Sequence, residues 1–222
     1  DGYVLDAPVK ELASRAALVA ISVDYRLAPE HPFPAALEDS YRALEWLHEN
    51  AAALDVDSKH IGVMGGSAGG NIAAALTLMW RDRGGAPLAF QYLSVPSTDI
   101  SARTHWRSFD EMGDAYSLRV TSIREMQEIY APGNDAKLNP YASPLLAETH
   151  RGLPPALIVV AQFDPLRDQG IAYARALERD GVAVSLRVVP GALHGFVGSP
   201  ARARENMTVA TEWLRSTLSS PK

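Results

Sequence analysis

The sequence predicts an α/β fold in which a largely parallel sheet carries helices on both faces. Short apolar runs rich in β-branched residues alternate along the chain with longer segments whose apolar residues recur at helical spacing. That alternation is typical of βαβ units, in which each crossover helix covers the sheet. The 222 residues suffice for one domain with a substantial core, and no repeat, linker or low-complexity tract interrupts them. We therefore expect a single domain over residues 1–222.

Each expected strand is short and continuously apolar, as strands buried on both faces are. There are five of them, at residues 17–25, 61–64, 89–95, 156–161 and 184–189. Amphipathic periodicity predicts helices at residues 35–50, 71–80, 122–130, 168–180 and 201–218. Ser122 and Glu125 have the spacing of a capping box, and Gly181 is expected to end the helix before it. The proline-rich residues 26–34 and most of residues 97–155 are expected to be irregular.

Composition excludes several classes of function. The formal net charge of −5 offers no basic surface for nucleic acid or an anionic membrane. Without cysteine there is no disulfide, thiolate metal site or Cys nucleophile. No apolar run is long enough to span a bilayer and no signal peptide is evident, so a cytoplasmic location is expected. Because the chain begins at Asp1 rather than Met, we also expect sequence upstream of it.

Residues 65–69 read Gly-Gly-Ser-Ala-Gly and match the G-x-S-x-G pattern of a nucleophile elbow. They fall between an expected strand and an expected helix, where small neighbours permit the strained turn that exposes a serine. Ser67 is the candidate nucleophile, and the N–H of Ala68 at the helix start is a candidate oxyanion donor. A phosphate-cradling loop is the alternative, although neither the P-loop lysine nor the G-x-G-x-x-G spacing is present.

A serine nucleophile needs a histidine base and a carboxylate that orients the base. Of six histidines, only His194 directly follows an expected strand and precedes an expected helix at the end of the sheet that holds Ser67. Asp164 follows the expected strand 156–161, at its carboxyl end. Asp168 is the reserve carboxylate, since capping and the helix dipole explain an acidic residue there. The order Ser67, Asp164, His194 is that of α/β-hydrolases.

With these residues in view, the chain resembles the α/β-hydrolase superfamily and, within it, the hormone-sensitive-lipase-like esterases, among which bacterial carboxylesterases form the largest group. The resemblance covers residues 20–200 in family order and implies an α/β-hydrolase-type sheet with Ser67, Asp164 and His194 as the catalytic triad. The stretches that carry it are DYRLAPEHPFPA at 24–35, GSAGGN at 66–71, NPYASP at 139–144, LPPA at 153–156, DPLRD at 164–168 and HGF at 194–196.

The chain departs from the family pattern in two places. It has Gly65 and Gly66 where the family usually reads G-D before the serine, so altered hydrogen bonding beside the site is expected. The His-Gly-Gly-Gly stretch that supplies oxyanion donors is missing, and Gly2 is the candidate for its last glycine. The resemblance thus implies an N-terminally shortened fold without the family's cap segment. The strand at 17–25 would then re-pair with the next strand, or another chain would cover the free edge.

The residues together predict a serine carboxylester hydrolase that works through an acyl-enzyme and needs no cofactor or metal. The resemblance implies short-chain acyl esters as substrates and a homodimer formed through the edge strand 184–189. Side chains of the irregular middle either line the acyl or alcohol pocket or are simply core residues: Trp106, Phe109, Met112 and Tyr116. The alternatives are amide or peptide hydrolysis on the same triad, and a hydrolase-derived binding protein weakened by the missing oxyanion donor.

Overall fold

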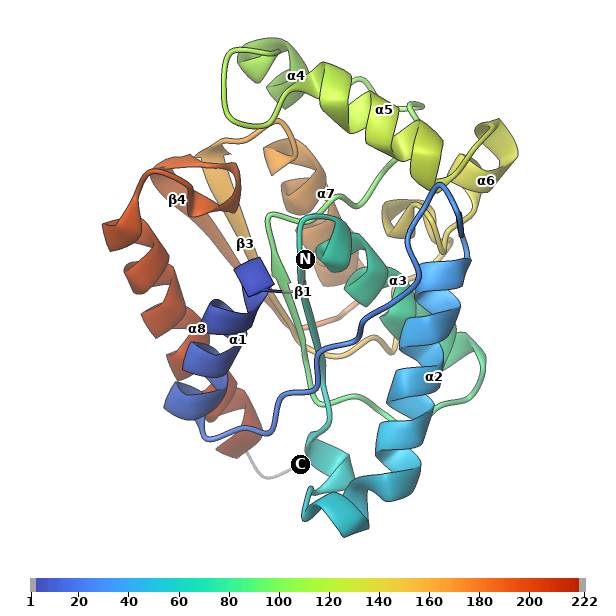
Figure 1. Ribbon diagram of the computed structural model, residues 1–222, viewed down its shortest axis with the longest axis vertical. Coiled ribbons are helices and arrows are strands. Elements are labelled where there is room, and N and C mark those ends of the chain that lie inside the picture. The colour runs from blue at the N-terminus through green and yellow to red at the C-terminus, as the bar shows by residue number, and fades with distance from the viewer. Residues whose placement is uncertain (1–2, 220–222) are drawn as a thin grey trace.

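The computed structural model describes residues 3–219 and has a four-stranded, entirely parallel sheet at its centre (Figure 1). The strands lie in the order β1-β2-β3-β4, which is also their order along the chain. They are β1 (Val63–Gly66), β2 (Gln91–Ser94), β3 (Ala156–Phe163) and β4 (Val184–Leu193). Because all four strands are parallel, their carboxyl ends lie at the same end of the sheet.

Helices cover both faces of the sheet. The α-helices are α1 (Tyr3–Ala16), α2 (Ala35–Asn50), α3 (Ala68–Asp82), α4 (Arg107–Met112), α5 (Val120–Tyr130), α6 (Asn134–Leu138), α7 (Arg167–Arg179) and α8 (Pro200–Ser219). Short 3-10 turns are η1 (Ala51–Leu54), η2 (Ser58–His60), η3 (Pro144–Leu146) and η4 (His194–Phe196). In Figure 1, α4 and α5 lie beyond the carboxyl ends of the strands.

Strand β3 shows how the sheet separates two apolar cores. Ile158 and Val160 face a core built with α2, α3 and α7, whereas Leu157 and Val159 face a second core built with α1 and α8. All four side chains are fully buried. Successive residues of a strand point to opposite faces, so a strand buried on both sides must be apolar throughout. The parallel sheet with helices on both faces, expected from the sequence, is thereby confirmed.

The strand expected at residues 17–25 is not formed, and residues 18–27 have no regular secondary structure. A strand requires a hydrogen-bonded neighbour and burial of its side chains, and this segment joins no strand of the described sheet. Val19 and Ile21 are 66% and 44% exposed. Of the two expected alternatives, re-pairing of the segment with the next strand is therefore wrong, and β1 is the edge strand of the described sheet on this side.

The helix expected at residues 35–50 has those bounds in the structure, the other expected elements are present with shifted ends, and three further α-helices were not expected. Helix α1 occupies the start of the described chain, while α4 and α6 interrupt the expected irregular middle. The capping box at Ser122 and Glu125 is wrong because α5 begins two residues earlier, at Val120. Asp114 stabilises that end instead, since its carboxylate accepts hydrogen bonds from the N–H and the hydroxyl of Thr121. Within residues 3–219, none of the helices has the length and apolar character that a bilayer crossing would demand.

We predict that Leu157→Ala lowers the free energy of unfolding by about 2–5 kcal/mol, because it leaves a cavity where a fully buried side chain stood. Leu27→Ala removes the same atoms from a side chain that is 64% exposed and should cost less than about 1 kcal/mol. Urea unfolding at equilibrium measures both variants. Equal losses would contradict the two-sided core described above.

Candidate active site

Ser67 lies at the junction of β1 and α3, in a strained backbone conformation. Its φ of 54° and ψ of −117° are uncommon for a residue with a side chain. The turn is held against β2, because the N–H of Ser67 donates to the carbonyl oxygen of Ser94 over 2.9 Å. Gly65 makes the turn possible, since a Cβ there would lie 2.1 Å from the carbonyl oxygen of Gly69. Gly65 thus allows β1 and α3 to cross closely, and the Ser67 side chain extends from that crossing.

His194 and Asp164 reach Ser67 from the ends of β4 and β3. His194 Nε2 lies 2.9 Å from Ser67 Oγ, and His194 Nδ1 lies 2.8 Å from Asp164 Oδ2. The Asp164 carboxylate accepts a hydrogen bond from Nδ1–H, which leaves Nε2 free to accept a hydrogen bond from the serine hydroxyl. The other carboxylate oxygen accepts the N–H of Leu166 over 2.9 Å. The three side chains form one continuous line of hydrogen bonds, with Asp164 fully buried.

An irregularity in β4 sets the position of His194. Ala161 pairs with Val189, but Phe163, two residues on, pairs with Leu193, four residues on. The extra β4 residues include Gly191, which has a φ of 65° and whose N–H donates to Gln162 Oε1 over 2.7 Å. Such bulges re-aim the strand that carries them. Sequence reasoning ended this strand at Val189, although Pro190 and Gly191 are residues that mark a bulge.

The remaining candidate residues are distributed as follows. Ala68 is the first residue of α3, so its N–H has no acceptor within the helix and stands beside Ser67. Gly2 lies outside the described residues. Asp168 does not contact His194; its carboxylate accepts from the N–H of Ser108 and from Arg167 Nε, each over 2.8 Å. The structure therefore brings Asp164, and not the reserve carboxylate, to the histidine.

The four pocket candidates lie in and around α4. Trp106 immediately precedes this helix, while Phe109 and Met112 belong to it. Met112 is buried, whereas Tyr116 is 38% exposed and stacks on Phe163 with ring centroids 5.6 Å apart. Since Phe163 directly precedes Asp164, the segment lies against the strand end that carries the carboxylate.

The sequence assigns no role to Asn71, which holds two loops beside the site through hydrogen bonds. Its side-chain amide donates to the carbonyl oxygens of Ser97 and Ala142, each over 2.8 Å. The hydrogen bond from Asn71 to Ala142 therefore joins the stretch GSAGGN to the stretch NPYASP.

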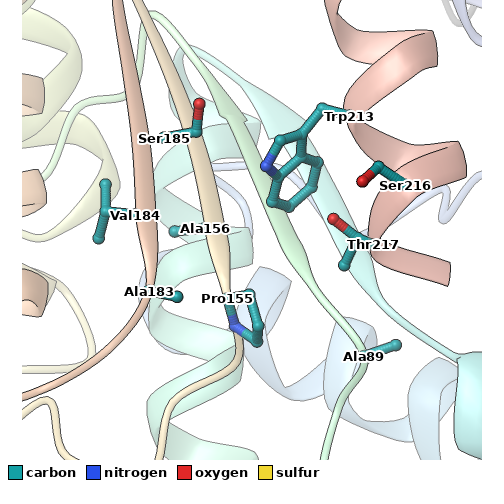
Figure 2. A pocket seen from close by; sticks show the side chains of 9 residues that line it. All are labelled: Ala89, Pro155, Ala156, Ala183, Val184, Ser185, Trp213, Ser216 and Thr217. Atoms are coloured by element: carbon teal, nitrogen blue, oxygen red, sulfur yellow. The ribbon is translucent and has the colours of Figure 1, made fainter. Parts of the chain in front are cut away.

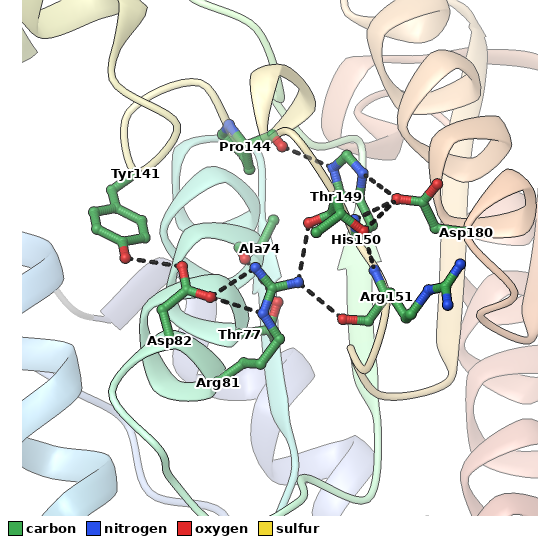
Figure 3. Close-up of polar contacts among 10 residues, drawn as sticks. All are labelled: Ala74, Thr77, Arg81, Asp82, Tyr141, Pro144, Thr149, His150, Arg151 and Asp180. Carbon is green, nitrogen blue, oxygen red and sulfur yellow. Dashed lines mark hydrogen bonds and ion pairs between the residues drawn. The ribbon is translucent and has the colours of Figure 1, made fainter.

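In the loop that follows Ala142, His150 is buried between α3 and α7, with Nε2 2.9 Å from the carbonyl oxygen of Pro144 (Figure 3). Its backbone N–H donates to Asp180, and burial lowers the pKa of its imidazole.

The cavity in Figure 2 lies away from this line of hydrogen bonds. It has a volume of about 380 Å³ and opens at the amino ends of β3 and β4, beside the last turns of α8. Its lining residues are Ala89, Pro155, Ala156, Ala183, Val184, Ser185, Trp213, Ser216 and Thr217. Among the residues that the structure describes, no three or more His, Asp or Glu side chains converge as a metal site requires.

The chain belongs to the α/β hydrolase fold family, whose model matches residues 3–198. It is 44% identical over 197 residues to carboxylesterase NlhH of Mycobacterium tuberculosis, a match that covers 86% of this chain and 60% of that protein. It is 38% identical to an ethyl acetate hydrolase of Pseudomonas putida, covering 98% and 71%. The resemblance to hormone-sensitive-lipase-like carboxylesterases is confirmed, and the chain spans about three fifths of the length of NlhH.

Solved structures agree with these relatives. A thermostable esterase from Pseudomonas putida superposes with a TM-score of 0.94 at 32% identity, covering all of this chain and 71% of the esterase. A hyperthermophilic esterase from the archaeon Pyrobaculum calidifontis superposes with a TM-score of 0.91 at 38% identity, covering 96% and 69%. The described fold is therefore shared with both esterases.

We predict that Gly65→Ala destabilises the protein by about 1–3 kcal/mol, because the new Cβ collides with the backbone of α3. Gly66→Ala is the matched control: its Cβ would lie 3.7 Å from the carbonyl oxygen of Ser94, an ordinary contact. Both changes reduce the entropy of the unfolded chain equally, so the difference isolates the collision. Thermal and urea unfolding measure it, and equal stability of the two variants would contradict the role given to Gly65.

Proposed function

We propose that the protein is a serine carboxylester hydrolase that acts on short-chain acyl esters. The observation that carries the proposal is the continuous line from Ser67 Oγ through His194 to Asp164, with hydrogen bonds of 2.9 and 2.8 Å, on a strained strand-to-helix turn. Membership of the α/β hydrolase family and similarity to carboxylesterases support it. We also propose that residues 1–222 act as one catalytic domain.

In the proposed reaction, Ser67 Oγ attacks the ester carbonyl carbon while His194 Nε2 takes the hydroxyl proton. The tetrahedral oxyanion accepts a hydrogen bond from the N–H of Ala68, where the amino end of α3 favours negative charge. When the intermediate collapses, the C–O bond to the alcohol breaks and His194 returns the proton to the departing oxygen. Water then attacks the acyl-enzyme with the same proton transfers and releases the carboxylic acid.

Asp164 stabilises the imidazolium that forms at each transfer. Its burial removes competition from water, and its two oxygens are held by His194 and by the N–H of Leu166. Fixing the imidazole in this orientation keeps Nε2 directed at the reacting oxygen. Asp164 thus orients His194 and stabilises its protonated form without itself taking a proton.

Short acyl esters are the proposed substrate class. A relative that is 38% identical is an ethyl acetate hydrolase, and another of the same identity is an arylesterase of Saccharolobus solfataricus. We propose that the acyl or alcohol group contacts the segment around α4, with Trp106, Phe109, Met112 and Tyr116 as candidate contacts. The position of this segment against Phe163, next to Asp164, supports that assignment.

We predict that Ser67→Ala abolishes hydrolysis of p-nitrophenyl acetate, with kcat falling by roughly a thousandfold or more. A serine-directed phosphonate should label the wild type but not this variant. Ser40→Ala is the control: the Ser40 hydroxyl is likewise hydrogen-bonded, donating to the carbonyl oxygen of Ala36 over 2.8 Å, but Ser40 is buried within α2. That variant should keep both activity and labelling.

The same experiment separates the alternative functions. Faster turnover of a p-nitroanilide than of the matching ester would favour an amide hydrolase. Labelling without turnover would favour a weakened, ligand-binding hydrolase, because the loss of one oxyanion donor costs about a hundredfold to a thousandfold in rate. A wild type that neither hydrolyses nor labels would contradict the enzyme proposal.

We propose further that two copies pair through β4, which lies at the edge of the described sheet and exposes Leu186 and Val188 by 39% and 43%. Val188→Lys should convert the dimer to a monomer, because like charges would meet across the two-fold axis. Leu27→Lys, on an equally apolar exposed residue elsewhere, should leave the dimer intact. Light scattering after size-exclusion chromatography measures the mass, and a monomeric wild type would overturn this proposal.

A further inference from the structure

A second network of contacts joins α4 to the turn that carries Asp164. We call residues 163–168 the acid turn. Ser108, fully buried in α4, donates from Oγ to the carbonyl oxygen of Pro165 over 2.5 Å and from its backbone N–H to Asp168 over 2.8 Å. Ser108 of α4 is therefore hydrogen-bonded to two residues of the acid turn, Pro165 and Asp168.

Arg167 extends the connection through its guanidinium group. One nitrogen, Nη2, binds Glu111 of α4 over 2.7 Å, and Nε binds Asp168 over 2.8 Å. A third nitrogen donates to the carbonyl oxygen of Gln162 over 3.2 Å. The Arg167 side chain is only 18% exposed, so these charge-assisted bonds are better shielded from water than ordinary surface pairs. The hydrogen bond from Arg167 also lowers the pKa of Glu111.

Helix α4 depends on such contacts for its position. It has six residues, and a helix of that length is unstable by itself in water. Its anchors are the contacts of Ser108 and Glu111, together with the stacking of Tyr116 on Phe163. Each of these contacts is made to a residue of the acid turn.

The contacts of Asp168 exceed what a helix cap requires. An acidic residue in the first turn of α7 is favourable to the helix dipole wherever its side chain points. Here one carboxylate oxygen receives the N–H of Ser108 from another helix, and the other receives Arg167 Nε. No side chain caps α7 at Leu166. The carboxylate is thus directed toward α4.

We propose that Asp168 and Ser108 are positioning residues, which hold the substrate-facing helix α4 and the orienting carboxylate Asp164 in one fixed relation. This inference rests on the proposed ester hydrolase. If the network loosens, Asp164 loses its alignment with His194 and kcat falls for every ester. Phe109 and Met112 also lose their fixed place, so KM rises more for longer acyl chains, which reach further from Ser67.

Asp168→Asn tests the inference, because the amide nitrogen cannot accept a hydrogen bond and must face either Ser108 N–H or Arg167 Nε. We expect kcat to fall about tenfold on p-nitrophenyl acetate, butyrate and hexanoate, with KM rising further for hexanoate than for acetate. Hydrogen exchange of residues 107–112, followed by mass spectrometry, should accelerate.

Asp180→Asn is the matched control from the other end of α7. Asp180 likewise accepts a hydrogen bond from a backbone N–H, that of His150 (Figure 3). It also binds the preceding arginine, Arg179. This variant should change stability without the dependence of KM on chain length and without faster exchange in α4. Equal kinetics and equal exchange for Asp168→Asn and Asp180→Asn would overturn the positioning role.

Glu111→Gln covers the case in which Asp168→Asn fails to fold, since Glu111 is partly exposed and its loss leaves Ser108 in place. It should raise KM for hexanoate and accelerate exchange in α4, and an unchanged KM and exchange would overturn the proposal. An inactive wild type would contradict the ester hydrolase itself, whereas an active wild type with an indifferent network contradicts only the positioning role.

Discussion

The close crossing of β1 and α3 at Gly65 and Gly69 is the constraint on which the rest of the site depends. Only a glycine at position 65 allows the two backbones to approach so closely, because a Cβ there would lie 2.1 Å from the carbonyl oxygen of Gly69, and that approach holds Ser67 at a positive φ. Strain of this kind persists when the surroundings over-determine it. Here the hydrogen bond to Ser94 and the packing of α3 on the sheet do so. The serine hydroxyl is consequently presented at one defined point, and the histidine and carboxylate must be brought to it.

The parallel sheet meets that requirement. Ser67, Asp164 and His194 are up to 127 residues apart along the chain, but each follows a strand whose carboxyl end lies at the same edge. The continuous run of apolar residues in β3 buries that strand between two cores, so the backbone supporting Asp164 has little freedom to move. The bulge at Gly191 supplies the last adjustment, carrying β4 past the end of regular pairing to His194. Rigid strands and one local irregularity thus cooperate.

Much of this arrangement could be predicted because it rests on local signals. Gly65, Gly66 and Gly69 mark the turn at Ser67, and the strand positions place Asp164 and His194 at one edge. The segment at residues 17–25 shows the limit of such reasoning. Its β-branched residues satisfy the pattern of a buried strand, but strand formation depends on a neighbour that pattern alone does not reveal. Helix α4 was missed for a related reason, since Ser108, Glu111 and Tyr116 are held by tertiary contacts rather than by helical propensity.

The two aspartates of the acid turn show the same limit most directly. Asp164 and Asp168 have identical side chains, lie four residues apart and follow the same strand, so the sequence separates them only by distance from the strand end and by the helix start that explains an acidic residue at position 168. Burial and direction separate them: Asp164 is fully buried and faces His194, whereas the side chain of Asp168 is 24% exposed and faces Ser108. A carboxylate that stabilises an imidazolium must contact the imidazole and be shielded from water, and Asp164 alone of the two meets both conditions. Asp168 instead binds the backbone N–H of Ser108 and the side chain of Arg167, so the short motif DPLRD contains two carboxylates with separate structural roles.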